Sequence, residues 1–147
     1  MKRAGFTMIE LIFVIVILGI LAAVAIPKLA ATRTDANVAK GATDISTLVS
    51  DLGSFYTSQG TFSGKNTSDI TNVQIRTATS SLSDGDTMDY SVDGNTSACI
   101  TITINTVADG NVTVGAGSDT GVVCTAVKKK AANLMKSFKF GGTGVSY

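Results

Sequence analysis

The chain is poor in the residues that enzymes and metal sites use. It has no His, which is the commonest general base and metal ligand in proteins, and it has two Cys. Two Cys without any His fall short of the four ligands that a structural zinc site needs. The composition therefore predicts a protein that is not an enzyme and that holds no cofactor.

Glu10 is the residue whose surroundings make it chemically unusual. It lies in a run over residues 6–26 that is otherwise apolar except for one Thr and one Gly. As a helix, this run would span about 31 Å, close to the hydrocarbon core of a bilayer. The basic residues Lys2 and Arg3 would hold the preceding end of the chain in the cytoplasm. Because an acid at membrane depth is costly, Glu10 indicates a function and a partner.

Two other interpretations of the apolar run remain open at this point. The segment Ala23-Val24-Ala25 has the A-x-A pattern of a secretory signal peptide, whose removal would release a secreted enzyme or binding protein. The run could also be a simple membrane anchor. Glu10 argues against both, because neither a signal peptide nor an anchor requires a carboxylate in its apolar core.

The residues around Glu10 resemble a known processing signal. The stretch Gly5-Phe6-Thr7-Met8-Ile9-Glu10-Leu11, after a short basic leader, is similar to the class III signal of type IV prepilins and pseudopilins. The resemblance implies that a prepilin peptidase cleaves between Gly5 and Phe6 and methylates the new Phe6 amine. Pro27 also matches a proline that many members of this family carry.

The resemblance gives Glu10 a partner. After cleavage, Phe6 would carry a positively charged amine at the end of an apolar helix. Glu10 of a neighbouring subunit could pair with that amine, so that neither charge stays unpaired within an apolar filament core. We expect this pair to select one axial stagger between subunits.

The predicted fold is α+β and pilin-like, a long N-terminal helix with a small antiparallel sheet packed on its second half. We divide the chain into a leader peptide (residues 1–5), a transmembrane and filament-core helix (6–27), an amphipathic helical spine (28–56), a loop (57–86) and a sheet-bearing head (87–147). The head includes a disulfide-closed region and a basic C-terminal tail.

Two residues are predicted weak points of the long helix. Gly19 lowers helix propensity, and Pro27 removes a backbone donor and clashes with the preceding turn. The resemblance implies that the stretch between them can lose helicity inside an assembled filament.

The head is predicted to be built mainly from short strands. Alternating apolar and polar residues predict strands over residues 88–92, 98–105 and 112–114, with Ile side chains on the inner face of the second strand. We also expect a strand over 122–127, a short strand near 73–75 and a last strand at the C-terminus. The basic tail has helical spacing around Ala131, Leu134 and Phe138, which predicts a short amphipathic helix.

Cys99 and Cys124 can form one intramolecular disulfide. The chain beyond the anchor is expected in an oxidising compartment, where disulfides persist, although two buried free thiols are the alternative. We expect both residues on strands. The resemblance agrees with the bridge, because pilins often carry one disulfide in this part of the head.

A group of carboxylates in the head is a candidate calcium site, since some pseudopilins bind calcium in a nearby loop: Asp84, Asp86, Asp89 and Asp93. Their spacing lacks the Glu that closes an EF-hand loop. We therefore interpret them as solvated turn residues and predict no metal site.

Charge is unevenly distributed along the head. Residues 41–127 carry nine Asp and two basic residues, whereas the last twenty residues carry five Lys and no acid. This asymmetry favours contact between the tail of one subunit and the acidic body of another. DNA is a weaker candidate partner, because the tail lacks interleaved aromatic residues.

The sequence therefore predicts a homopolymeric filament subunit, a type IV pilin serving adhesion, twitching motility or uptake. A pseudopilin of a type II secretion system is the alternative. Its partners would be other copies of the chain, the inner membrane, the prepilin peptidase and the assembly machinery. We expect a single-pass inner-membrane protein before assembly, and an extracellular pilus or periplasmic pseudopilus afterwards.

Overall fold

The computed structural model describes residues 5–92 and 94–142. The chain divides into two compact units, Met1–Ala36 and Asn37–Tyr147. Most of the predicted leader peptide and the predicted C-terminal strand lie outside the described residues.

The described part of the first unit consists of the N-terminal part of helix α1 (Met8–Gln59) and the short non-helical stretch before it. The helix continues without interruption through Gly19 and Pro27, the two predicted weak points. A Pro inside a helix removes one backbone hydrogen bond, so Pro27 lowers the stability of α1 without ending the helix. Loss of helicity between these residues during assembly stays a prediction.

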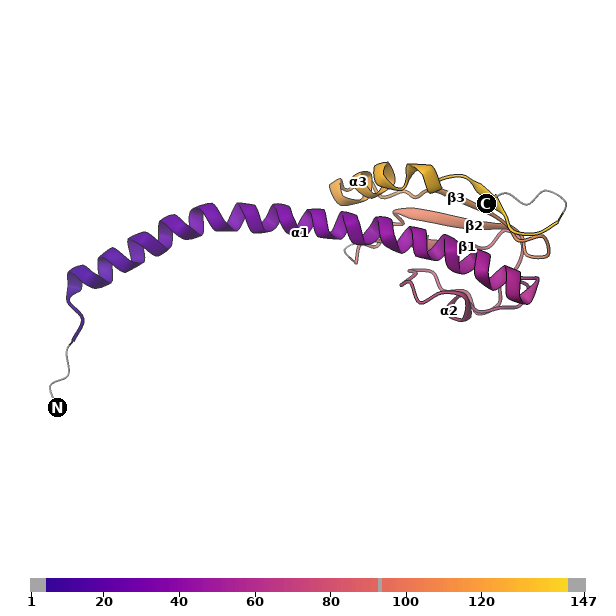
Figure 1. Cartoon of the computed structure of the whole chain (residues 1–147), viewed down its shortest axis with the longest axis horizontal. Helices are drawn as coiled ribbons and strands as arrows, with labels where there is room; N and C mark the ends of the chain where they lie inside the picture. Colours follow the sequence, from indigo (N-terminus) through magenta and orange to yellow (C-terminus); the bar gives the residue numbers. More distant parts are fainter. Residues whose placement is uncertain (1–4, 93, 143–147) are drawn as a thin grey trace. The chain divides into compact units, whose positions relative to one another are not determined.

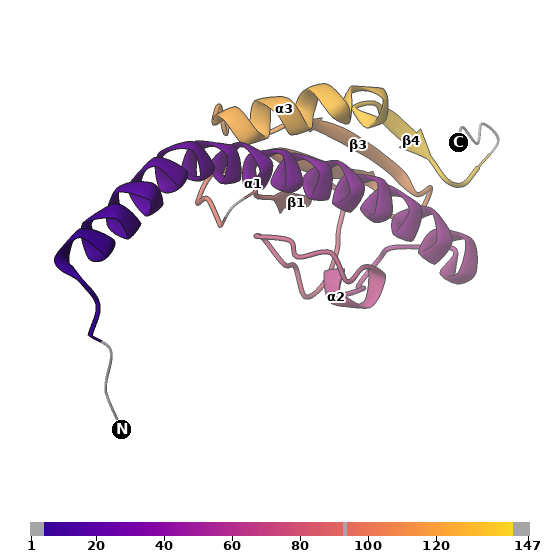
Figure 2. The same cartoon turned by 60° about the vertical axis from the view of Figure 1, so that its left-hand side comes forward.

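The second unit combines the rest of α1 with a four-stranded antiparallel sheet. The strands β1 (Thr87–Tyr90), β2 (Ile100–Thr106), β3 (Asn111–Ala116) and β4 (Ser137–Lys139) are adjacent in chain order. Figures 1 and 2 both show the strands running alongside this part of α1. The α+β class with a sheet on a helical spine is therefore confirmed.

The core lies between α1 and one face of the sheet. The apolar side chains of β2 alternate as predicted, with Ile100, Ile102 and Ile104 fully buried and the residues between them more exposed. Every second residue of a strand points to the same face, so this alternation places the Ile face on the helix. The helix contributes one buried stripe to the same core: Val38, Ile45, Leu48, Leu52 and Tyr56.

The predicted strand over residues 122–127 is wrong, because this segment begins helix α3 (Val122–Lys130). Its buried side chains are Cys124 and Val127, and Ala131 is buried just beyond the helix end. A spacing of three and then four residues lies on one helical face, and burial of that face outweighs the strand preference of Val122 and its neighbour. Lysines in the last turn also favour the helix, because cations stabilise its C-terminal end.

Two further predictions in this unit are wrong. The basic tail forms no amphipathic helix over its predicted extent; it continues as a 3-10 turn, η1 (Ala132–Leu134), and then as β4. Phe138 is buried in β4, opposite Val112. Residues 73–75 form no strand, and the regular element of the predicted loop is the short helix α2 (Thr67–Ile70).

Gly41 lets α3 pack closely on α1, and we expect Gly41→Val to destabilise the second unit by about 1–3 kcal/mol through overpacking. A Cβ atom at Gly41 would lie 2.8 Å from Val127 Cγ2 and 3.4 Å from Val92 Cγ1. Denaturant unfolding of the detergent-solubilised chain, followed by circular dichroism, measures the loss.

The matched control for this prediction is Ala39→Val, at an exposed position of the same helix. Ala39→Val lowers helix propensity by about 0.5 kcal/mol and places no atoms in a packed region. Equal unfolding midpoints for the two variants would contradict the close packing at Gly41.

Candidate functional site

The N-terminal part of α1 has an apolar surface without a covering partner among the described residues. Every described residue from 5 to 33 is exposed, and Phe6 has 88% of its surface accessible. The helix contains a stretch long and apolar enough to cross a membrane. Exposed apolar surface of this extent marks a membrane or protein contact site.

Glu10 caps the start of this helix together with Thr7. The Glu10 carboxylate oxygen Oε2 accepts hydrogen bonds from the Thr7 backbone N–H (2.8 Å) and from its hydroxyl (2.7 Å). The Glu10 N–H in turn donates to Thr7 Oγ1 (3.3 Å). This reciprocal arrangement is a capping box, which satisfies backbone donors at a helix N-terminus.

Thr7 was missed as a functional residue by the sequence analysis. Its signal was present, because Thr followed three residues later by Glu, before an apolar run, is the sequence pattern of a capping box. The hydrogen bonds occupy Oε2, and no described residue donates a hydrogen bond to Oε1 of Glu10. One oxygen of the carboxylate is therefore left for a donor from another molecule.

The comparison with protein families concerns this same end of the chain. Residues 1–26 match a family model described as the prokaryotic N-terminal methylation motif. The chain carries a prepilin signal. This is the class III signal of type IV pilins and pseudopilins, and it supports one of these two kinds of subunit without separating them. No curated protein and no solved structure matched the chain significantly.

The prepilin signal agrees with the local structure at the predicted cleavage position. Gly5 and Phe6 are exposed and precede the helix, whose first residue is Met8. A peptidase can reach an exposed bond outside regular structure more readily than one held inside a helix. The signal implies processing by a prepilin peptidase and anchoring of the apolar helix in a membrane.

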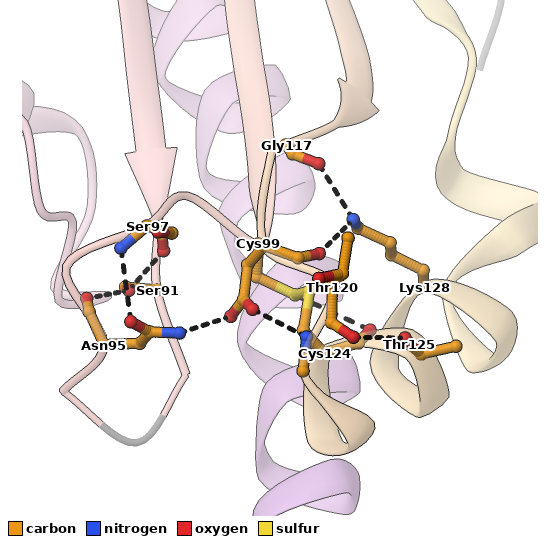
Figure 3. The surroundings of a disulfide bond; sticks show 11 residues. Ser91, Asn95, Ser97, Cys99, Gly117, Thr120, Cys124, Thr125 and Lys128 are labelled. Atoms are coloured by element: carbon orange, nitrogen blue, oxygen red, sulfur yellow. Dashed lines mark hydrogen bonds between the residues drawn. A yellow bond between two sulfur atoms is a disulfide. The ribbon is translucent and has the colours of Figure 1, made fainter.

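The disulfide between Cys99 and Cys124 is present in the second unit (Figure 3). Both residues are fully buried, and their Cα atoms are 5.5 Å apart, within the usual range for a bridge. Cys99 directly precedes β2, and Cys124 lies in the first turn of α3, where a strand was predicted. The bridge therefore joins the start of β2 to a helix rather than joining two strands.

Lys128, one of the lysines of the basic tail, forms hydrogen bonds within the head. Its ammonium group donates to the carbonyl oxygens of Gly117 (2.8 Å) and Asp119 (2.7 Å), as Figure 3 shows for Gly117. The Asp119 side chain is nearly buried and accepts hydrogen bonds from the Gly121 N–H (2.8 Å) and from Asn95 Nδ2 (3.0 Å). This lysine therefore ties α3 to the loop that follows β3.

The carboxylates considered for calcium each have partners within the fold. Asp84 accepts a hydrogen bond from the Val107 N–H (2.7 Å), and Asp86 accepts two from Ser83. Asp89 forms an ion pair with Arg76 (2.6 Å). Asp93 lies outside the described residues. Within residues 5–92 and 94–142, no three acidic, Cys or His side chains are grouped closely enough to hold a metal ion.

Proposed function

We propose that this chain is the structural subunit of a type IV pilus, assembled by packing of the apolar helix against the helices of other copies. The observation that carries the proposal is the prepilin signal, which continues directly into a helix whose described residues are exposed to residue 33. Association of such helices removes apolar surface from water or lipid and orders the subunits along an axis.

Each part of the chain has a role in this proposal. Gly5 and Phe6 flank the cleaved bond, and the Phe6 amine is methylated. Residues 6–27 span the inner membrane and later form the filament core, while 28–56 form the spine of the head. Glu10 pairs with the Phe6 amine of a neighbouring copy through its free oxygen.

The alternative, a pseudopilin of a type II secretion system, shares the prepilin signal with a type IV pilin. The two differ in where the filament extends. A type IV pilus extends from the cell surface, whereas a pseudopilus stays in the periplasm. The buried Cys99–Cys124 bridge favours the pilus, because the resemblance to pilins includes one disulfide in the head.

The experiment that tests the proposal locates the processed chain and its first residue. Cells are sheared, and the released filaments and the membrane fraction are analysed by intact and peptide mass spectrometry. We expect a chain that begins at a methylated Phe6 in both fractions. Processed chain confined to the periplasm and membrane would support the pseudopilin, and a chain beginning at Ile26 would overturn both assignments.

A further inference from the structure

Three segments of the head have the pattern of an N-linked glycosylation site, a sequon, in which Asn is followed two residues later by Ser or Thr. They are residues 66–68, 95–97 and 111–113, with Asn66, Asn95 and Asn111 as the possible acceptors. The pattern specifies the group that would occupy it, because the Asn amide nitrogen of a sequon is the atom that a glycosyltransferase joins to a sugar. The fold decides which of the three acceptors is accessible.

Asn111 is held inside the sheet. It is the half-buried first residue of β3 and is paired with Thr106 of β2 on one side and with Lys139 of β4 on the other. The hydroxyl of Thr113, which completes this sequon, lies 2.9 Å from the Ser137 hydroxyl. A transferase would have to separate three paired strands to bind residues 111–113, so this sequon is closed in the folded head.

The side-chain amide of Asn95 is engaged at both ends. Its Nδ2 donates to the nearly buried carboxylate of Asp119 (3.0 Å), and its Oδ1 accepts a hydrogen bond from the Ser97 N–H (3.4 Å) (Figure 3). A sugar on this nitrogen would bring a bulky group against the nearly buried Asp119 side chain. The folded head therefore disfavours attachment at Asn95.

Asn66 differs from the other two acceptors because its side chain is exposed and has no hydrogen-bond partner among the described residues. It directly precedes α2, which lies at the edge of the second unit in Figures 1 and 2. Ser68, whose hydroxyl completes this sequon, is also exposed, and its hydroxyl contacts no described polar group. The acceptor nitrogen and the hydroxyl that a transferase recognises are therefore both accessible.

The backbone around Asn66 can open without disturbing the sheet. Asn66 itself has extended backbone (φ −78°, ψ 142°), and α2 has four residues, too few for a helix that is stable by itself. Buried Thr67 holds this segment in place, since its N–H and its hydroxyl bond to the Thr79 carbonyl oxygen (3.1 and 3.3 Å). Thr79 lies outside any helix or strand, so local opening costs less here than in the paired strands around Asn111.

We propose that Asn66 is a site of N-linked glycosylation. The donor is a sugar whose C1 atom carries a phosphate leaving group. A bond forms between C1 and Asn66 Nδ2, the bond between C1 and the phosphate oxygen breaks, and the phosphate leaves with that bonding pair. One amide proton passes to a base on the transferase. Sequons are used in surface loops of secreted proteins, and the membrane anchoring that the prepilin signal implies agrees with a head outside the cytoplasm. The inference does not require the proposed filament.

The test is mass spectrometry of tryptic peptides from the protein purified from its own cells. Cleavage after Lys65 and Arg76 releases residues 66–76, whereas the other two sequons both lie in the next peptide, residues 77–128. We expect peptide 66–76 to carry the added mass of one or more sugars and to release sugar fragment ions on collision. Electron-transfer fragmentation should place the added mass on Asn66.

Substitutions in the same peptide separate an N-linked sugar from a sugar on a hydroxyl. Asn66→Gln and Ser68→Ala each destroy the sequon, and we expect both to lose the added mass completely. Ser68→Thr preserves the sequon and should keep the modification. Asn72→Gln is the matched control, because Asn72 is an exposed Asn of the same peptide that lies outside any sequon, and it should also stay modified. All of these positions are exposed, and thermal unfolding confirms that each variant is folded.

Three results would overturn the proposal. The first is an unmodified mass for peptide 66–76 of the wild-type protein. The second is an added mass that persists in Asn66→Gln, which would place the sugar on a hydroxyl. The third is modification confined to peptide 77–128, which would mean that accessibility in the folded head does not decide which sequon is used.

Discussion

We expect Glu10→Val to leave cleavage and methylation at Phe6 largely intact and to lower the yield of assembled filament about tenfold or more. In the proposed filament, the Phe6 amine of the neighbouring copy would then have no carboxylate partner within the apolar core. Loss of one partner of a buried ion pair is strongly unfavourable, because the remaining charge stays unsolvated. Immunoblots of sheared filaments, normalised to total chain, measure the yield.

The capping box requires a control, because Glu10→Val also removes a helix cap. Thr7→Val removes the hydroxyl that bonds to Glu10 Oε2 but keeps the carboxylate. Loss of a capping side chain typically costs about 1 kcal/mol, which a helix held in a membrane or filament tolerates. We therefore expect Thr7→Val to assemble at near wild-type yield.

The two variants together separate pairing of the amine from capping of the helix. Equal defects in Thr7→Val and Glu10→Val would show that Glu10 acts through the helix end. Normal filament yield from Glu10→Val would contradict the proposed pairing of Glu10 with the Phe6 amine. Mass spectrometry of the N-terminus must accompany both measurements, because an uncleaved chain cannot present a Phe6 amine.

Removal of the disulfide lowers the free energy of unfolding of the second unit by about 3–4 kcal/mol. The bridge links two residues that are 25 positions apart in the sequence. Closing a loop of this length restricts the entropy of the unfolded chain, and the expected loss of about 3–4 kcal/mol follows from that restriction. The variant that tests it is Cys99→Ala combined with Cys124→Ala. Ala is preferred to Ser here because both positions are fully buried and a hydroxyl would need a partner.

The measurement is urea unfolding of the detergent-solubilised chain, with and without reductant. Reductant should destabilise the wild-type protein to a similar extent as the double substitution and should leave the double variant unchanged. A wild-type loss below about 1 kcal/mol, in a sample whose free thiols are confirmed by labelling, would contradict the prediction.

Features of this protein that depend only on residues close together in the sequence could be predicted from the sequence. The prepilin signal, the apolar run and the alternation of Ile and Thr in β2 are each contained in a short segment. Their physical meaning follows from helix length, bilayer thickness and the two-residue period of a strand. The capping box at Thr7 belongs to this group as well, because its two residues are three positions apart.

The segment around Cys124 required the tertiary structure. Val122 and Val123 favour a strand by propensity, whereas Cys124 and Val127 are buried on one side of a helix. Burial against the core and the bridge to Cys99 are contacts with distant residues. Such contacts override local propensity, so the sequence of this segment alone pointed to the wrong element.

Contacts between distant residues also decide the position of Lys128 and the side chains on the outer face of the sheet. Lys128 is one of five lysines in the tail, and only the position of the loop after β3 made its ammonium group a bridge between two carbonyl oxygens. The alignment of Thr87, Thr103, Thr113 and Ser137 on the outer face depends on the register of all four strands. A shift of one residue in a strand would turn its side chains to the other face. The sequence alone determined the signal and the long helix, because both are local. The tertiary structure decided the surface of the head, because strand register is set by pairing between distant segments.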